Sequence, residues 1–147
     1  MASFVYDAFK EQLVQNEYGW AKGSPDTYKI LLLNTAIGTG DSDETTVAAV
    51  IAGDLEYTPD QRETIASQSI TPGSGSTTGL DAADTIFTTL APGGVGEQVN
   101  SLLLYVHIAG GDANCKPAAV FALATPFTGN GATVTFTWNA AGLITLS

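Results

Sequence analysis

Positively charged residues are scarce in this sequence. Only five of its 147 residues are Lys or Arg, against fifteen Asp or Glu, and the formal net charge is −10 at pH 7. The five cations are spread between Lys10 and Lys116 and do not cluster. Phosphate groups are bound by several cations placed close together. We therefore expect neither nucleic acid nor an anionic membrane surface as a partner.

Cysteine and histidine occur once each, as Cys115 and His107. A single cysteine excludes an internal disulfide framework. We interpret Cys115 as a packed thiol, since no histidine or acid close in sequence favours catalysis, and partners brought near by the fold are left open. His107 is expected on the same strand face as Leu103 and Tyr105, as a packed or partly exposed side chain rather than a ligand or general base. Without a second histidine or a C-x-x-C pair, the sequence predicts no metal site.

Long apolar runs are also missing. No window approaches the roughly 18–20 apolar residues of a membrane-spanning helix. The first residues, Met1-Ala2-Ser3, are not followed by the basic and apolar regions of a signal peptide. These observations predict a soluble protein made in a cytoplasm.

Motifs that point to chemistry are incomplete. The acidic loop at 38–44 contains D-x-D but not the remaining ligands of a calcium loop, and the glycines at 93–96 lack the Lys-Ser/Thr of a P-loop. Asp81 and Asp84 are three residues apart, where we expect a turn or strand entry rather than a paired-carboxylate site. We assign no catalytic residue, cofactor or metal, and expect no enzymatic activity.

The composition is that of a folded, β-rich domain. Hydrophobic residues make up 44% of the chain and charged residues 14%, which is too apolar for a disordered protein. The length suits one domain over residues 1–147. Sixteen glycines and frequent threonines favour many short strands joined by turns.

The clearest strand signal covers 132–139, where Val134, Phe136 and Trp138 alternate with threonines. The Asn130-Gly131 pair just before it is a hairpin signal, which predicts 118–124 as the antiparallel partner. The run 143–146 is expected to follow as the last strand of a C-terminal meander.

Four other segments are expected to be strands. Residues 27–34 are apolar on both faces, as in a central strand covered on each side, and 100–109 form the most apolar run, typical of a buried strand. Residues 62–71 alternate weakly and predict an exposed or edge strand, followed by a loop at 72–79. Residues 84–90 predict a further strand.

Two helices are expected. Residues 3–16 have an apolar stripe at helical spacing, with Ser3 as the predicted cap, and 45–53 form a short helix ended by Gly53. We favour packing of the first helix on the chain's own sheet over docking on a neighbouring subunit. Together these elements predict a mainly β fold, an antiparallel β-sandwich or small barrel of about seven strands with an N-terminal helix and one short helix.

Several segments occur in a characteristic order: Y-D-A-F-K-E-Q-L at 6–13, Trp20, T-Y-K-I-L-L at 27–32, D-A-A-D at 81–84, L-L-L-Y at 102–105 and the ending V-T-F-T-W-N at 134–139. This order resembles that of small virion structural proteins of tailed bacteriophages. The likeness covers nearly the whole length and departs from the pattern around 58–79. Each motif is a core or turn pattern, so the resemblance rests on their order.

The resemblance implies a structural role on the particle. The first interpretation is a capsid decoration or cement protein that binds the outer face of the major capsid protein lattice, as a homo-oligomer for which a trimer is the expected state. The alternative is a tail, adaptor or fibre-associated structural protein. Deletion of residues 1–10 is expected to weaken particle binding more than folding. The candidate subunit-interface residues are Phe4, Val5, Phe9, Pro72, Gly73 and Thr77.

A third interpretation is a carbohydrate-binding β-sandwich. Trp20, Tyr18 and Tyr28 would then be exposed and stack on sugar rings. The competing interpretation, which we favour, is that Trp20 belongs to the core at the start of a strand.

Overall fold

The centre of the fold is a five-stranded antiparallel sheet in the order β1-β8-β7-β2-β3. The structure is a computed structural model and describes residues 3–14, 19–20, 27–34, 42–58, 60–72, 78–139 and 143–146. The sheet contains β1 (Phe4–Val5), β2 (Thr27–Leu33), β3 (Arg62–Thr64), β7 (Val99–His107) and β8 (Lys116–Phe127). The expectation of a mainly β chain is confirmed.

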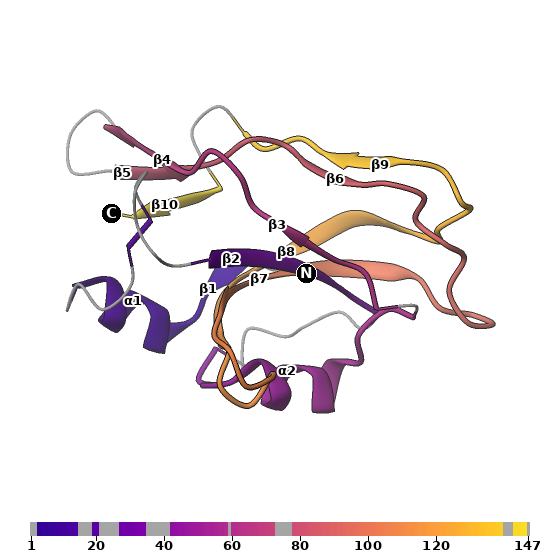
Figure 1. Cartoon of the computed structure of the whole chain (residues 1–147), viewed down its shortest axis with the longest axis horizontal. Coiled ribbons are helices and arrows are strands. Elements are labelled where there is room, and N and C mark those ends of the chain that lie inside the picture. Colours follow the sequence, from indigo (N-terminus) through magenta and orange to yellow (C-terminus); the bar gives the residue numbers. More distant parts are fainter. Residues whose placement is uncertain are drawn as a thin grey trace.

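Two smaller sheets and two helices accompany the large sheet. One small sheet has the order β10-β5-β4, from β4 (Ser69–Pro72), β5 (Thr78–Asp81) and β10 (Ile144–Leu146). The other is a ribbon of β6 (Thr85–Phe87) and β9 (Val134–Phe136). In Figure 1, β4, β5, β6 and β9 lie above the large sheet, while α1 (Asp7–Val14) and α2 (Val47–Asp54) lie below it. The described residues contain ten strands rather than about seven, and their pairings close no barrel.

The strand β2 is central, as its sequence predicts. It pairs with β7 from Thr27↔His107 to Leu33↔Ser101 and with β3 on its other side. Alternate side chains of a strand point to opposite faces, so Ile30 and Leu31 lie on different faces, and both are completely buried. Each such side chain contributes roughly 1.5–3 kcal/mol when it is removed from water.

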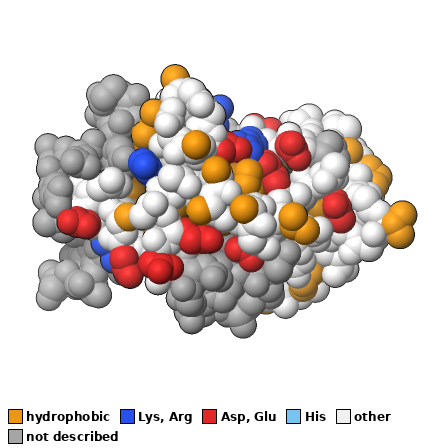
Figure 2. Space-filling view, turned by 90° about the horizontal axis from the view of Figure 1, so that it is seen from below, with side chains coloured by type: hydrophobic (Ala, Val, Ile, Leu, Met, Phe, Trp, Pro, Cys, Tyr) orange, Lys and Arg blue, Asp and Glu red, His pale blue; other side chains and the backbone are white. Residues whose placement is uncertain are grey.

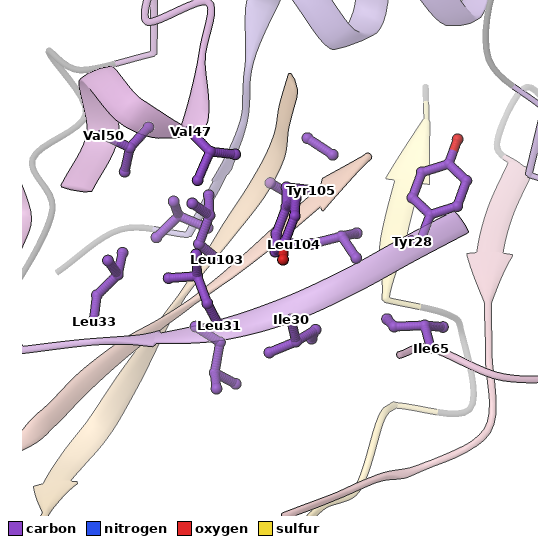
Figure 3. Close-up of a cluster of buried hydrophobic side chains, with 14 of the residues drawn as sticks. Tyr28, Ile30, Leu31, Leu33, Val47, Val50, Ile65, Leu103, Leu104 and Tyr105 are labelled. Carbon is purple, nitrogen blue, oxygen red and sulfur yellow. The ribbon is translucent and has the colours of Figure 1, made fainter. Parts of the chain in front are cut away.

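The helix α2 covers one face of this sheet. Figure 3 shows Val47 and Val50 pointing from α2 toward the strands, and both are fully buried. Thr46 caps the helix, since its hydroxyl oxygen accepts a hydrogen bond from the Ala49 N–H at 3.2 Å. The helix continues past Gly53, the expected terminator, to Asp54. Leu55 ends it with a φ of 47°, and its N–H donates to the Ile51 carbonyl.

The N-terminal segment differs from the single helix expected at 3–16. Phe4 and Val5 form β1 and pair with Val120 and Ala119 of β8, so the helix begins only at Asp7. Ser3 does not cap it. Its hydroxyl accepts a hydrogen bond from the Ala122 N–H at 3.1 Å. The open edge of β8 offers these residues strand pairing, which outweighs the helical spacing of their side chains.

The predicted pairing of the C-terminal strands is wrong. Asn130 and Gly131 do form a turn, with Gly131 at a φ of 83°, but the Gly131 N–H donates to the Leu90 carbonyl at 2.8 Å. The turn thereby directs the chain toward β6 rather than back along β8. A Cβ on the neighbouring Gly129 would lie 2.2 Å from the Ala91 carbonyl oxygen, so this close approach requires glycine.

As a result, the C-terminal third is not a meander. β9 pairs with β6 through Thr85↔Phe136 and Phe87↔Val134, whereas β10 pairs with β5. The segment at 62–71, expected as one strand, forms two strands in different sheets, β3 and β4. Both are edge strands, which confirms the predicted edge position.

Trp20 joins the two layers. Its indole Nε1–H donates to the carbonyls of Ser69 and Asp81, both at 3.0 Å, where β4 and β5 begin and end. Its ring packs on Tyr28 of β2 with the centroids 4.6 Å apart. Only 3% of the Trp20 surface is exposed, so the expectation of a core tryptophan is confirmed.

No helix in the described segments has the length and apolar character needed to cross a membrane.

We predict that Trp20→Phe destabilises the protein by about 1–3 kcal/mol, because it leaves two carbonyl groups without their donor while retaining a ring against Tyr28. Urea unfolding followed by circular dichroism measures this loss. Trp138→Phe is the matched control. Its Nε1–H donates to the Thr85 hydroxyl alone and its ring is only partly buried, so a smaller loss is expected. Equal losses in the two variants would contradict the role of Trp20 as the link between layers.

Candidate interaction surface

The sequence-predicted interface residues lie in two places. Phe4 and Val5 are in β1, half-buried against the core, while Phe9 on α1 is completely buried. Pro72 is the last residue of β4. Gly73 and Thr77 lie outside the described residues. Phe4 and Val5 therefore lie at the β1 edge of the large sheet, whereas Phe9 packs on Tyr28 of the inner strand β2.

The burial of α1 changes what the N-terminal truncation would do. Tyr6 and Phe9 are both fully buried in the core, and the Phe9 ring packs edge-to-face on Tyr28 at 6.2 Å. Deletion of residues 1–10 would remove both side chains, and removing one large core aromatic costs about 3–5 kcal/mol. We therefore expect unfolding, and the truncation does not separate particle binding from folding.

A charged cluster surrounds Arg62 at the end of the large sheet. The Nε–H of Arg62 donates to Glu56 Oε1 at 2.7 Å, and its Nη1–H donates to Asp112 Oδ1 at 2.6 Å. The guanidinium also lies 5.8 Å from the centre of the Tyr105 ring. Asp112 is in the turn between β7 and β8, so Arg62 ties that turn to β3 and to the segment after α2.

These contacts shift the pKa values of the groups involved. Hydrogen bonds to Glu56 and Asp112 raise the pKa of Arg62 above its ordinary value. The hydrogen bonds from Arg62 lower the pKa of Asp112, and burial raises the pKa of Tyr105. All three shifts hold Arg62 and Asp112 charged and Tyr105 neutral near pH 7. The cluster therefore has the properties of a structural clamp.

Cys115 and His107 lie close to this clamp. The Cys115 Sγ is 3.7 Å from His107 Nδ1, so the fold supplies a histidine neighbour to the thiol. The thiol itself is only 1% exposed. Its Sγ contacts both the Ile108 N–H and the Ile108 carbonyl at 3.4 Å. Burial and these backbone contacts confirm the packed thiol, and His107 is exposed on its strand rather than buried.

Other carboxylates also hold the chain's own backbone. Asp81 accepts a hydrogen bond from the Ala82 N–H at 2.8 Å, and Asp84 accepts from the Trp138 N–H at 3.1 Å. Glu97 accepts from the N–H groups of Thr58 and Gly94 at 3.2 and 3.0 Å. Among the described residues, no three His, Cys, Asp or Glu side chains are grouped to hold a metal ion.

Large aromatic side chains remain half-buried between β8 and β9. The rings of Phe121 and Trp138 lie 5.3 Å apart, and those of Phe127 and Phe136 lie 6.2 Å apart. All four pack against the core but are incompletely covered. They come from β8 and from β9 and the residues just after it, in different layers, so the region between these strands is apolar.

The same region contains no charged side chain of its own. All twenty charged residues lie within residues 1–116, and the sequence from 117 to 147 has none. The neutral surface is defined as the exposed outward residues of the β6–β9 ribbon and the residue after it, Ile86, Thr135 and Thr137. The half-buried Phe121, Phe127 and Trp138 lie on the inner side of the ribbon, where the Trp138 Nε1–H donates to the buried Thr85 hydroxyl. Ile86 is 51% exposed and lies directly opposite Thr135.

The face below the large sheet is different in character. Figure 2 views the molecule from this side, and acidic side chains are distributed across the face with few basic ones. Asp7 of α1 and Asp43 before α2 are exposed among them. Acidic residues also occur in the upper layer, as Asp81 in β5 and exposed Asp84 before β6, but the chain after Lys116 contributes none.

Sequence reasoning did not identify the neutral surface. The charge-free stretch from 117 to 147 was a readable signal, but the aromatic residues on it are also typical of a core. Only the observed pairing of β9 with β6 places Ile86 opposite Thr135 on this surface. Conversely, the aromatic platform for sugars is not formed, because Trp20 and Tyr28 are buried; Tyr18 lies outside the described residues.

No protein-family model, curated protein or solved structure matches this chain.

We predict that Asp112→Asn lowers stability at pH 7 by about 1 kcal/mol, a value reduced by solvent screening because the Asp112 side chain is 27% exposed. Since the folded state lowers the pKa of Asp112, its contribution is present above the unfolded pKa of about 3.9 and is lost as the pH falls through the folded pKa. The variant should lose less stability than the wild type between neutral and strongly acidic pH.

Chemical unfolding at a series of pH values tests this. Asp7→Asn is the control, because Asp7 pairs with Lys10 at 2.8 Å on an exposed helix surface, where ion pairs contribute little. If Asp112→Asn and the wild type lose stability in parallel on acidification, the clamp does not depend on the charge of Asp112.

Proposed function

We propose that this chain is a bacteriophage virion structural protein, a capsid decoration or cement protein that binds the outer face of the major capsid protein lattice and stabilises it. The observation that carries the proposal is that the charged side chains bind the chain's own backbone, while several large apolar side chains are incompletely buried. The ionisable groups around Arg62, Glu97 and Asp84 bind the chain's own loops. Ile86 is 51% exposed, and Phe127 and Trp138 are only partly covered by the core. This distribution favours a protein that acts by contact over one that acts by chemistry.

The resemblance in the order of motifs supports the same role. A particle-bound protein is made in the host cytoplasm in many copies before assembly, and a net charge of −10 keeps such copies soluble. A homo-oligomer, with a trimer as the expected state, would match symmetric positions on a lattice. The role requires no cofactor, nucleic acid or membrane.

We also infer that the layers form an open antiparallel β-sandwich. The large sheet would form one layer, and the two small sheets would together form the other. Trp20 and the cross-strand neighbours Ile144, Leu80 and Ile70 would lie between the layers. Ile144 and Leu80 are buried and Ile70, in the edge strand β4, is 49% exposed. A sandwich of this kind presents rigid strand edges and loops for contact.

The alternative is a tail, adaptor or fibre-associated structural protein. It uses the same kind of contact surfaces at a different position on the particle, and the charge distribution is compatible with both.

Electron microscopy of particles purified from the phage that encodes this chain distinguishes the two positions. We expect on the order of hundreds of copies at regular sites on the outer capsid lattice. A ring of about six or twelve copies at the tail would support the alternative. Absence of the chain from mature particles, or turnover of a substrate by the purified protein, would rule out both.

A further inference from the structure

The turn that leads into β9 contains the one Asn-Gly pair of the sequence, Asn130-Gly131. In such a pair the glycine nitrogen readily attacks the asparagine side-chain amide, because glycine has no side chain to hinder the approach. Asn130 is exposed to water, and Gly131 has a φ of 83°. Asn130 is therefore the asparagine of this chain that is chemically most prone to deamidation.

Deamidation at this pair has two steps and consumes one water molecule. The Gly131 nitrogen loses its proton and bonds to Asn130 Cγ, while the bond from Cγ to Nδ2 breaks and ammonia leaves. Water then opens the resulting succinimide ring at either of its two carbonyl groups. The products are aspartate and isoaspartate, each with a new carboxylate, and neither step involves an oxidant or a reductant.

Both reacting groups are held by hydrogen bonds in the folded chain. The Gly131 N–H donates to the Leu90 carbonyl at 2.8 Å, and the Ala132 N–H donates to Asn130 Oδ1 at 3.0 Å. The Leu90 N–H donates in return to the Ala132 carbonyl at 2.9 Å. The Gly131 nitrogen keeps its proton and the Asn130 side chain keeps its orientation as long as these bonds are closed. The reaction therefore requires local opening of the turn.

A buried tyrosine anchors this turn to the segment that contains Leu90. The Tyr57 hydroxyl accepts a hydrogen bond from the Gly129 N–H at 2.9 Å and donates to the Ala91 carbonyl at 3.1 Å. Tyr57 is only 1% exposed, so water does not compete for these two backbone groups. Gln61 holds the same segment, since its Oε1 accepts from the Ala91 N–H at 3.3 Å.

We propose that Asn130 is a deamidation site that the fold keeps unreactive, and that the Tyr57 hydroxyl is the positioning group that keeps the turn closed. This inference goes beyond the proposed function and does not depend on it. Conversion of Asn130 places a carboxylate in residues 117–147, which otherwise have no charged side chain. Isoaspartate also lengthens the main chain by one carbon atom, which displaces the Gly131 N–H from the Leu90 carbonyl.

The test is peptide mapping by mass spectrometry after incubation of the purified full chain at mildly alkaline pH. We expect Asn130 to convert more slowly in the folded wild type than in the wild type unfolded by urea. Tyr57→Phe should raise the rate in the folded protein by about tenfold, because two backbone groups lose their hydrogen-bond partner and the open turn becomes more populated. The rate should rise with pH, since the attacking nitrogen must lose its proton, and isoaspartate should be among the products.

Tyr105→Phe is the matched control. It removes a hydroxyl from a tyrosine that is equally buried, at 1% exposure, but that lies in β7 beside Arg62, and it should leave the rate of Asn130 conversion unchanged. Gln61→Ala is a second test variant, because it releases the Leu90 segment while the Tyr57 hydroxyl remains. It should also raise the rate, and it decides the question if urea unfolding shows that Tyr57→Phe does not fold.

Four results would overturn the proposal. The first is an equal rate of conversion in the folded and the unfolded wild type, since the turn would then give no protection. The second is a folded Tyr57→Phe variant that converts no faster than the wild type, and the third is an equal acceleration by Tyr105→Phe. The fourth is formation of aspartate without isoaspartate, which would mean that water hydrolyses the amide directly and that the Gly131 nitrogen takes no part.

Discussion

The rest of the structure depends on the pairing of β2 with β7 along the whole of β2. Both strands are almost entirely apolar, and their side chains are buried on both faces of the sheet. A sheet of this kind cannot leave either face in water, because each exposed side chain would lose roughly 1.5–3 kcal/mol. The helix α2 therefore covers one face, and the small sheets cover the other. Trp20 fixes these covers in place by hydrogen-bonding to one layer and packing on the other.

Charge is used in two separate ways in this molecule. The half-buried cations and acids stabilise turns, as Arg62 does by joining Glu56 to Asp112. The exposed acids give the helix side of the molecule its negative character. Neither use extends to residues 117–147, which contain no charged side chain. The C-terminal stretch therefore adds apolar and hydroxyl side chains to the molecule but no charge.

The strands with strong local signals were predictable, but their partners were not. Residues 27–34 and 100–109 were expected as buried strands, and both are. The alternation at 134–138 correctly predicts a strand, which the structure forms over Val134–Phe136. The predicted partner strand is wrong, because the Gly131 N–H donates to the Leu90 carbonyl and leads the chain to β6. The predicted helix ends differ for a similar reason. Ser3 has a capping hydroxyl and Gly53 a flexible backbone, but the pairing of Phe4 and Val5 with β8 moves the first helix start to Asp7, and the second helix ends one residue after Gly53, at Asp54.

The sequence by itself determined that this is a mainly β chain with an apolar central strand, a strongly negative charge and a charge-free C-terminal stretch. These properties follow from composition and from the local alternation of side chains, both of which can be read directly from the sequence. The tertiary structure alone decided that β9 joins β6, that Cys115 meets His107, and that the rings of Phe121 and Trp138 meet. Strand partners are chosen by contacts between residues far apart in the chain, and no local pattern records which of several apolar strands will meet.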